Sequence, residues 1–123
     1  MYEVSVKDRF SAAHQLAEVG GGCERLHGHN FTVEVFVRSE TLTDGGTVID
    51  FRVLKTALAE VLTILDHTFL NDLDAFKDAG PSSERLARFI HGELAARLSD
   101  KGLPPPFRVD VWESENSRAS YRE

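Results

Sequence analysis

Two histidines separated by one glycine, with a cysteine four residues before the first, form the densest group of reactive side chains: Cys23, His27 and His29. In a β-strand, alternate side chains point to the same face, so His27 and His29 would lie side by side. A catalytic zinc ion usually takes three protein ligands and keeps one position open. His14 is the candidate third ligand, because an antiparallel pairing of the segments flanking the glycine-rich loop brings it beside the other two. The spacing therefore predicts a three-histidine zinc site.

Cys23 is the only cysteine, which excludes a disulfide within the chain. Three interpretations of this thiol remain open. It is a fourth ligand in a closed Cys-His₃ zinc site, a nucleophile or base beside the metal, or a buried bystander. Geometry has to decide between them.

Two further carboxylates are candidates for chemistry. Asp66 precedes His67, and a carboxylate beside an imidazole can fix its tautomer and raise its basicity. The alternative is a polar helix end. Glu113 ends an apolar strand pattern, and its two acceptor oxygens match the guanidine-like edge of a pterin or guanine. The alternative is a solvated strand end.

His91, in the middle of a predicted helix, is expected at the surface or at an interface.

Hydrophobic periodicity predicts the elements that position these residues. Alternating apolar residues predict strands over residues 2–14, 29–38, 107–113 and 118–122. Helical spacing predicts helices from Asp50, as N-cap, to Leu65 and from residues 81–84 to Gly102. Residues 68–79 read as a loop with at most a short helical turn. The order β-β-α-α-β-β predicts an α+β fold, an antiparallel sheet with both helices on one face.

The bulk composition limits the function classes. A chain of 123 residues is expected to form one domain, residues 1–123. A net charge of −6 with scattered basic residues argues against a nucleic-acid partner. Neither an apolar leader nor a membrane-length apolar run is evident, so a soluble cytoplasmic protein without a membrane partner is expected. The small core favours association between copies of the chain.

Six short motifs together resemble the 6-pyruvoyltetrahydropterin synthase superfamily, most closely its bacterial 6-carboxytetrahydropterin synthase branch of the queuosine pathway. The motifs are FSAAH (10–14), CERLHGHN (23–30), VIDF (48–51), LDHTFLN (65–71), PSSE (81–84) and VWE (111–113). Their order and combination are specific, and the resemblance covers nearly the whole chain.

The resemblance implies a tunnelling fold, in which trimeric β-barrels stack into a homohexamer, a dimer of trimers, with active sites between subunits. It also implies roles for individual residues. His14, His27 and His29 would hold Zn²⁺; Cys23 would be a base or acid, with Asp66 and His67 of a neighbouring subunit as its relay; Glu113 would anchor the pterin; and Ser82, Ser83 and Glu84 would occupy the place of a threonine-rich pterin-contacting loop.

The implied reaction converts 7,8-dihydroneopterin triphosphate to 6-carboxy-5,6,7,8-tetrahydropterin with loss of triphosphate and acetaldehyde, and needs no nicotinamide. Pyruvoyl product formation and aldol cleavage of dihydroneopterin are alternatives on the same scaffold. A non-catalytic Cys-His₃ zinc module is an alternative of another class, and a pterin-binding protein without turnover is a third.

Overall fold

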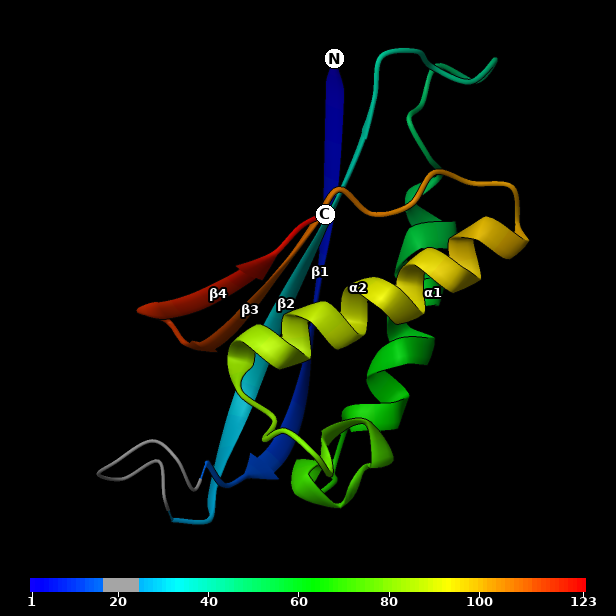
Figure 1. Ribbon diagram of the computed structural model, residues 1–123. Coiled ribbons are helices and arrows are strands. Elements are labelled where there is room, and N and C mark those ends of the chain that lie inside the picture. Colours follow the sequence, from blue (N-terminus) through cyan, green and yellow to red (C-terminus); the bar gives the residue numbers. More distant parts are fainter. Residues whose placement is uncertain (17–24) are drawn as a thin grey trace.

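The computed structural model describes residues 1–16 and 25–123 (Figure 1). Four strands, β1 (Tyr2–His14), β2 (His27–Ser39), β3 (Arg108–Ser114) and β4 (Ser117–Tyr121), form one antiparallel sheet in the order β1-β2-β3-β4. Between β2 and β3 lie helices α1 (Phe51–Leu65) and α2 (Ser83–Asp100) and two short 3₁₀ turns, η2 (Leu70–Asp72) and η3 (Asp74–Phe76). The predicted β-β-α-α-β-β order is confirmed. Among the described residues, no helix combines the length and apolar character needed to cross a membrane.

Strands β1 and β2 form a long hairpin of 13 residues each, paired from Tyr2 with Ser39 to His14 with His27. Their apolar side chains alternate with polar ones, and the apolar set faces the core; Phe10 and Phe31 stack there with ring centroids 4.8 Å apart. The hairpin register thus brings the two ends that carry the histidines together.

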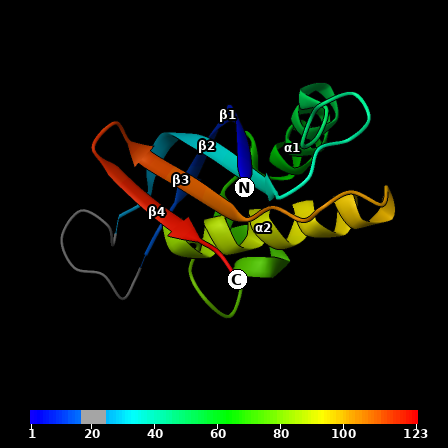
Figure 2. The same cartoon turned by 90° about the horizontal axis from the view of Figure 1, so that it is seen from above.

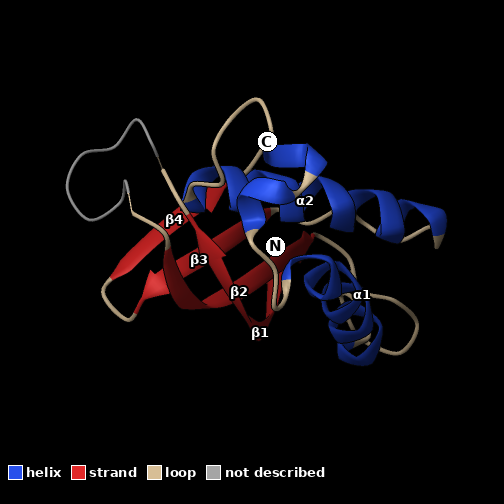
Figure 3. Cartoon of the chain, turned by 90° about the horizontal axis from the view of Figure 1, so that it is seen from below, coloured by secondary structure: helices blue, strands red, loops and turns tan. Residues whose placement is uncertain are grey.

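Both helices lie on the same side of the sheet (Figures 2 and 3). Helix α1 packs against β1, and α2 packs against β3 and β4. The buried positions of α1 recur at three- and four-residue spacing, which gives the helix one apolar stripe: Leu54, Ala57, Leu58, Val61, Leu62 and Leu65. The opposite face of the sheet carries mostly polar side chains, with Phe36 and Trp112 among them.

The predicted helix boundaries are confirmed by their caps. The Asp50 carboxylate accepts the backbone N–H of Arg52 at the start of α1, and the Ser82 hydroxyl accepts that of Arg85 at the start of α2. Gly102 follows α2 with a positive φ of 69°, the left-handed conformation that glycine adopts without strain. The caps fix where the loop carrying residues 66–82 leaves and rejoins the helical layer.

Candidate metal centre

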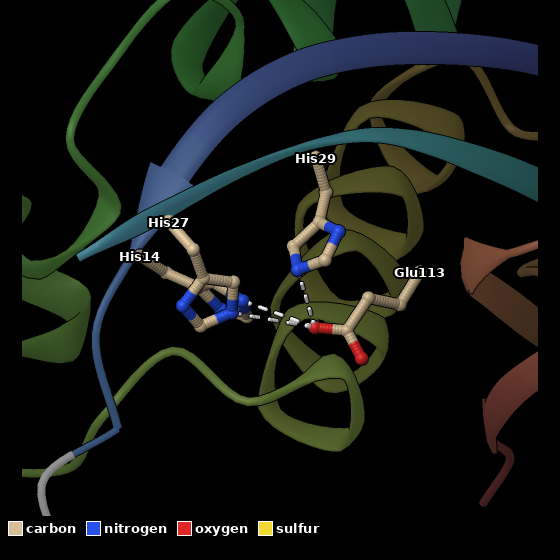
Figure 4. Close-up of side chains that lie close together, drawn as sticks. All are labelled: His14, His27, His29 and Glu113. Atoms are coloured by element: carbon tan, nitrogen blue, oxygen red, sulfur yellow. Dashed lines mark hydrogen bonds and ion pairs between the residues drawn. The ribbon is translucent and has the colours of Figure 1, made fainter. Parts of the chain in front are cut away.

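Three imidazoles and one carboxylate meet where the end of β1, the start of β2 and the end of β3 come together (Figure 4). Oε1 of Glu113 lies 3.1 Å from Nε2 of His14, 3.0 Å from Nε2 of His29 and 3.9 Å from Nε2 of His27. These four residues form a cluster whose ligand atoms all lie within 4.8 Å of one another. The predicted convergence of the three histidines is confirmed.

The sheet register explains how the cluster forms. His14 pairs directly with His27, and His29 follows two residues later on the same face as Phe31. On β3, Val109 and Val111 face the core. Glu113, two residues further on, points to the same side of the sheet, where the imidazoles lie. The β3–β4 register shifts between Trp112 and Ser114, so Glu113 lies in a bulge, a feature that often re-aims a side chain beside a functional site.

Backbone carbonyls orient two of the rings. Nδ1 of His14 lies 2.9 Å from the Pro81 oxygen, and Nδ1 of His27 lies 2.7 Å from the Arg25 oxygen. A carbonyl only accepts hydrogen bonds, so each Nδ1 carries a proton and donates it, which leaves Nε2 available as a ligand. This is the outer arrangement commonly found behind metal-bound histidine.

The donor set fits a divalent metal ion. Nε2 of His14 and Oε1 of Glu113 lie within hydrogen-bond distance at 3.1 Å, and a metal ion held between the imidazoles and the carboxylate would take the place of the shared proton. Nε2 of His29 is buried and forms no hydrogen bond. Burial lowers the pKa of the His29 imidazole below its ordinary value, and the Glu113 carboxylate opposes that shift without reversing it. A lowered pKa favours the neutral imidazole, which is the form that binds metals.

Asp66 and His67 lie apart from this cluster, beside the edge of β1. Asp66 accepts the Ser11 N–H through Oδ1 at 2.9 Å and pairs with Nδ1 of His67 through Oδ2 at 2.8 Å. The Ser11 N–H bond, followed by the His67 contact, holds the pKa of Asp66 below its usual value. His67 has a positive φ of 56°, its N–H donates to the Ser11 oxygen, and its side chain is 82% exposed. The pair is therefore held rigidly at its base and presented to solvent.

The predicted substrate residues lie around the start of α2. A pocket of about 270 Å³ is lined by Ser83, Glu84 and Glu113 together with residues 117–120 of β4. Ser82 does not line it, and its hydroxyl caps α2 instead. Glu113 borders both this pocket and the imidazoles. The sequence did not indicate this double contact.

Cys23 lies outside the described residues, so its three alternatives stay predictions. The prediction that His91 lies at the surface or at an interface is wrong for the single chain. His91 is 3% exposed, its Nε2 donates to the Pro106 oxygen at 3.0 Å, and its ring meets Tyr121 edge-on at 5.1 Å. The apolar spacing of α2 continues through His91, which was the available signal.

A family model described as 6-pyruvoyl tetrahydropterin synthase matches residues 3–123. The chain belongs to this family. It is 40% identical over 117 residues to the 6-carboxy-5,6,7,8-tetrahydropterin synthase of Synechocystis, covering 91% of this chain and 86% of that protein. It is 34% identical to the enzyme of the same name from Bacillus subtilis, covering 98% of this chain and 85% of that protein.

The family's fold is also found among solved structures. The Caenorhabditis elegans 6-pyruvoyl tetrahydropterin synthase superposes with a TM-score of 0.88 at 28% identity, covering 99% of this chain and 95% of that chain. The resemblance to the 6-pyruvoyltetrahydropterin synthase superfamily is therefore confirmed, and similar proteins include named 6-carboxytetrahydropterin synthases.

Proposed function

We propose that this chain is a zinc-dependent 6-carboxy-5,6,7,8-tetrahydropterin synthase. The substrate would be 7,8-dihydroneopterin triphosphate, and triphosphate and acetaldehyde would be released. The observation that carries the proposal is the cluster of His14, His27, His29 and Glu113, in a chain 40% identical to a synthase of that name. Such a product would supply a pathway like that of queuosine.

The proposed metal is Zn²⁺, which imidazole and carboxylate ligands suit. When bound, it would act as a Lewis acid that stabilises negative charge on the hydroxyl oxygens of the substrate side chain. The three imidazoles would keep it in place because His14 and His27 are fixed by the Pro81 and Arg25 carbonyls.

The proposed proton transfers belong to Cys23, Asp66 and His67. Cys23, as thiolate, would remove a proton from a side-chain carbon, and His67 would supply or accept the second proton with its tautomer fixed by Asp66. The exposure of His67 supports a role at the site of a neighbouring subunit. Oxidation of the side-chain carbon would be balanced by reduction of the ring and of the two-carbon fragment, with one water consumed.

Glu113, Ser83 and Glu84 are proposed to hold the pterin, with Ser82 at the margin of that site. Glu113, Ser83 and Glu84 line one pocket, and this supports the assignment. Two N–H groups of the pterin edge would donate to one carboxylate, a paired geometry that fixes orientation as well as affinity.

The proposed assembly is a homohexamer, a dimer of trimers in which each trimer forms a β-barrel and the two barrels stack. Within the described residues, β1 and β4 are the outer strands of the sheet, and β4 pairs only with β3. The end of β1 is bonded to residues 66–69, but the earlier part of its outer edge and the outer edge of β4 can offer backbone groups to another chain. Pairing β4 of one copy with β1 of the next would bring His67 toward a second subunit.

A second activity, 6-pyruvoyl product formation, is favoured by the similarity to the C. elegans enzyme of that name. One experiment separates the candidates: zinc-loaded protein is incubated with 7,8-dihydroneopterin triphosphate and the products are identified by mass spectrometry. The proposal predicts 6-carboxytetrahydropterin and acetaldehyde. A pyruvoyl pterin, a phosphorylated aldehyde from aldol cleavage, or unchanged substrate would each contradict it. The matched control is Cys23→Ala, which should keep its metal and lose most turnover.

A further inference from the structure

We propose that Asp110 is a positioning residue, which fixes the register of β4 on β3 through Ser120 and Arg118 and thereby sets the direction of the Glu113 side chain. The register lock stands on the contacts of this hairpin alone. The consequence for a pterin ligand rests on the proposed function. Asp110 thus acts on ligand binding without touching the ligand.

The Asp110 carboxylate is buried on the face of the sheet that carries no helix. It is 1% exposed, and among the residues that the structure describes only His14 and His91 are polar side chains with comparable burial. His14 belongs to the metal cluster, and His91 bonds to the Pro106 oxygen. Burial of a charge costs free energy unless the charge is paired and hydrogen-bonded. The contacts that offset this cost show what Asp110 holds in place.

Three side chains contact the two oxygens of this carboxylate. The Ser120 hydroxyl donates to Oδ1 at 2.6 Å. Arg108 approaches Oδ1 through Nε at 2.9 Å and donates to Oδ2 through Nη2 at 3.3 Å. Nη1 of Arg118 donates to Oδ2 at 3.5 Å. Arg108 belongs to β3 itself, whereas Ser120 and Arg118 belong to β4, so two of the three contacts join the strands.

Strand β4 has little else among its side chains to fix its register. It is an outer strand of five residues, and only Ala119 and Tyr121 lie on its helix-facing side, both partly buried. Register is weakly specified where a strand buries few apolar side chains. Ser120 lies directly opposite Asp110 in the ladder, so its hydroxyl reaches the carboxylate in this register. A slip by one residue would turn that hydroxyl to the other face.

The same register determines the surroundings of Glu113. The β3–β4 pairing shifts between Trp112 and Ser114, and Glu113 is left out of the ladder with β4. The pair that precedes it is Trp112 with Arg118, and the Arg118 guanidinium lies 5.6 Å from the centre of the Trp112 ring while it contacts Asp110. A side chain in a bulge takes its direction from the pairs on either side. The Asp110 contacts therefore reach Glu113 through its neighbouring pair.

The β3–β4 hairpin also forms one wall of the pocket proposed for the pterin. Residues 117–120 of β4 and Glu113 lie on this side, and Ser83 and Glu84 at the start of α2 lie on the other. A shift of β4 therefore moves this wall and Glu113 together. The paired N–H groups of a pterin edge need a carboxylate in one fixed orientation. Supporting hydrogen bonds of the Asp110 kind keep a binding group in such a geometry.

Amide hydrogen exchange tests the register lock. Ser120→Ala removes the hydroxyl at an exposed position, and Ser120→Thr keeps it. Ser5→Ala is the matched control, because Ser5 donates to the Glu34 carboxylate at 2.9 Å on the same sheet face but in the β1–β2 pair. We expect residues 108–121 to exchange about fivefold faster in Ser120→Ala, the effect of one hydrogen bond on a local opening equilibrium. The control should exchange there as wild type does.

Neopterin, a pterin with the substrate's side chain but without phosphates, tests the positioning role. Fluorescence titration of the zinc-loaded proteins should give at least about threefold weaker binding for Ser120→Ala, because the carboxylate is misaimed part of the time once a hydrogen bond of the lock is lost. Ser120→Thr should restore most of the affinity. With 7,8-dihydroneopterin triphosphate, KM should rise by a similar factor. Loss of folded protein alone would lower kcat and leave KM unchanged.

Four outcomes would overturn parts of the proposal. Wild-type exchange in Ser120→Ala would remove the lock, and equal losses in the alanine and threonine variants would show that the hydroxyl is not its basis. Faster exchange with wild-type neopterin affinity would make the lock purely structural and remove the positioning role. Failure of the wild type to bind neopterin would contradict the proposed function and the positioning role with it, while a clear exchange difference would still support the lock.

Discussion

His14 and His27 are direct partners in the β1–β2 ladder, and their rings meet edge-on with centroids 4.4 Å apart. The pairing is set by the register of two 13-residue strands, whose apolar face is buried along most of its length. A one-residue slip would move every side chain of one strand to the opposite face. The position of these two residues of the candidate metal site is therefore stabilised by the whole hairpin core.

The first prediction concerns metal retention. His27→Ala should lose the bound metal, because two imidazoles and a carboxylate then remain around an opened site. His67→Ala should keep it, since His67 lies outside the cluster. Metal content after purification and exhaustive dialysis measures both. Equal metal content in the two variants would contradict the assignment of the site.

Much of this site could be predicted from the sequence, because it depends on the two-residue repeat of a strand and on the antiparallel pairing of two neighbouring strands. The H-x-H spacing fixes a shared strand face, and the antiparallel hairpin fixes which end His14 reaches. Glu113 could be placed at a strand end, but its approach to the imidazoles depends on a bulge and on the position of β3 beside β2. Neither is readable from local spacing.

The second prediction concerns Asn71. Its side chain accepts the Gln15 N–H at 2.9 Å and donates to the Gln15 oxygen at 2.8 Å, next to His14 of the candidate metal site. Asn71→Ala should loosen this clamp and lower metal affinity by about tenfold, the usual cost of losing an outer contact. Chelator competition measures the change, and Asn116→Ala, at the exposed β3–β4 turn, is the control. Unchanged affinity in a folded Asn71 variant would show that the clamp does not position His14.

Buried polar residues were the least predictable feature. Asp110 lies on the sheet face opposite the helices, as the alternation of β3 predicts, but it is only 1% exposed. Ser120 donates to it at 2.6 Å, and Arg108 pairs with it at 2.9 Å. His91 is buried because the chain after α2 returns to bring Pro106 and Tyr121 against it. Such burial depends on which partners the fold brings together, and an isolated residue type does not reveal them.

The third prediction tests that burial. His91→Ala should lower the free energy of unfolding by about 2–4 kcal/mol, because it leaves a cavity and an unpaired Pro106 carbonyl. The same truncation at His67 should have a much smaller effect, since that side chain is 82% exposed. Urea unfolding monitored by circular dichroism compares the two. Similar losses in both variants would mean that the contacts of His91 contribute little.

The fourth prediction is a pH dependence from Asp66. Its folded-state pKa is lowered from the ordinary value of 3.8, mainly by the Ser11 N–H, so the ionised carboxylate stabilises the fold. That stabilisation is fully present above the unfolded-state pKa and is lost as the pH falls through the lowered folded-state pKa. Asp66→Asn should therefore be less stable than wild type at pH 6, and the difference should shrink below pH 3.8. Urea unfolding across pH 2–7 measures it.

Asp78→Asn, at an exposed position in a different part of the loop, controls for the general effect of removing one negative charge. Subtracting each variant from wild type at the same pH cancels the titration of groups that the two proteins share. A stability difference for Asp66→Asn that persists undiminished at pH 2 would contradict the prediction, because the carboxyl of the unfolded wild-type chain, with its ordinary pKa of 3.8, is then protonated. The loss at pH 6 must then come from packing, and the bond between the Ser11 N–H and the carboxylate would not be what holds residues 66 and 67 against the edge of β1.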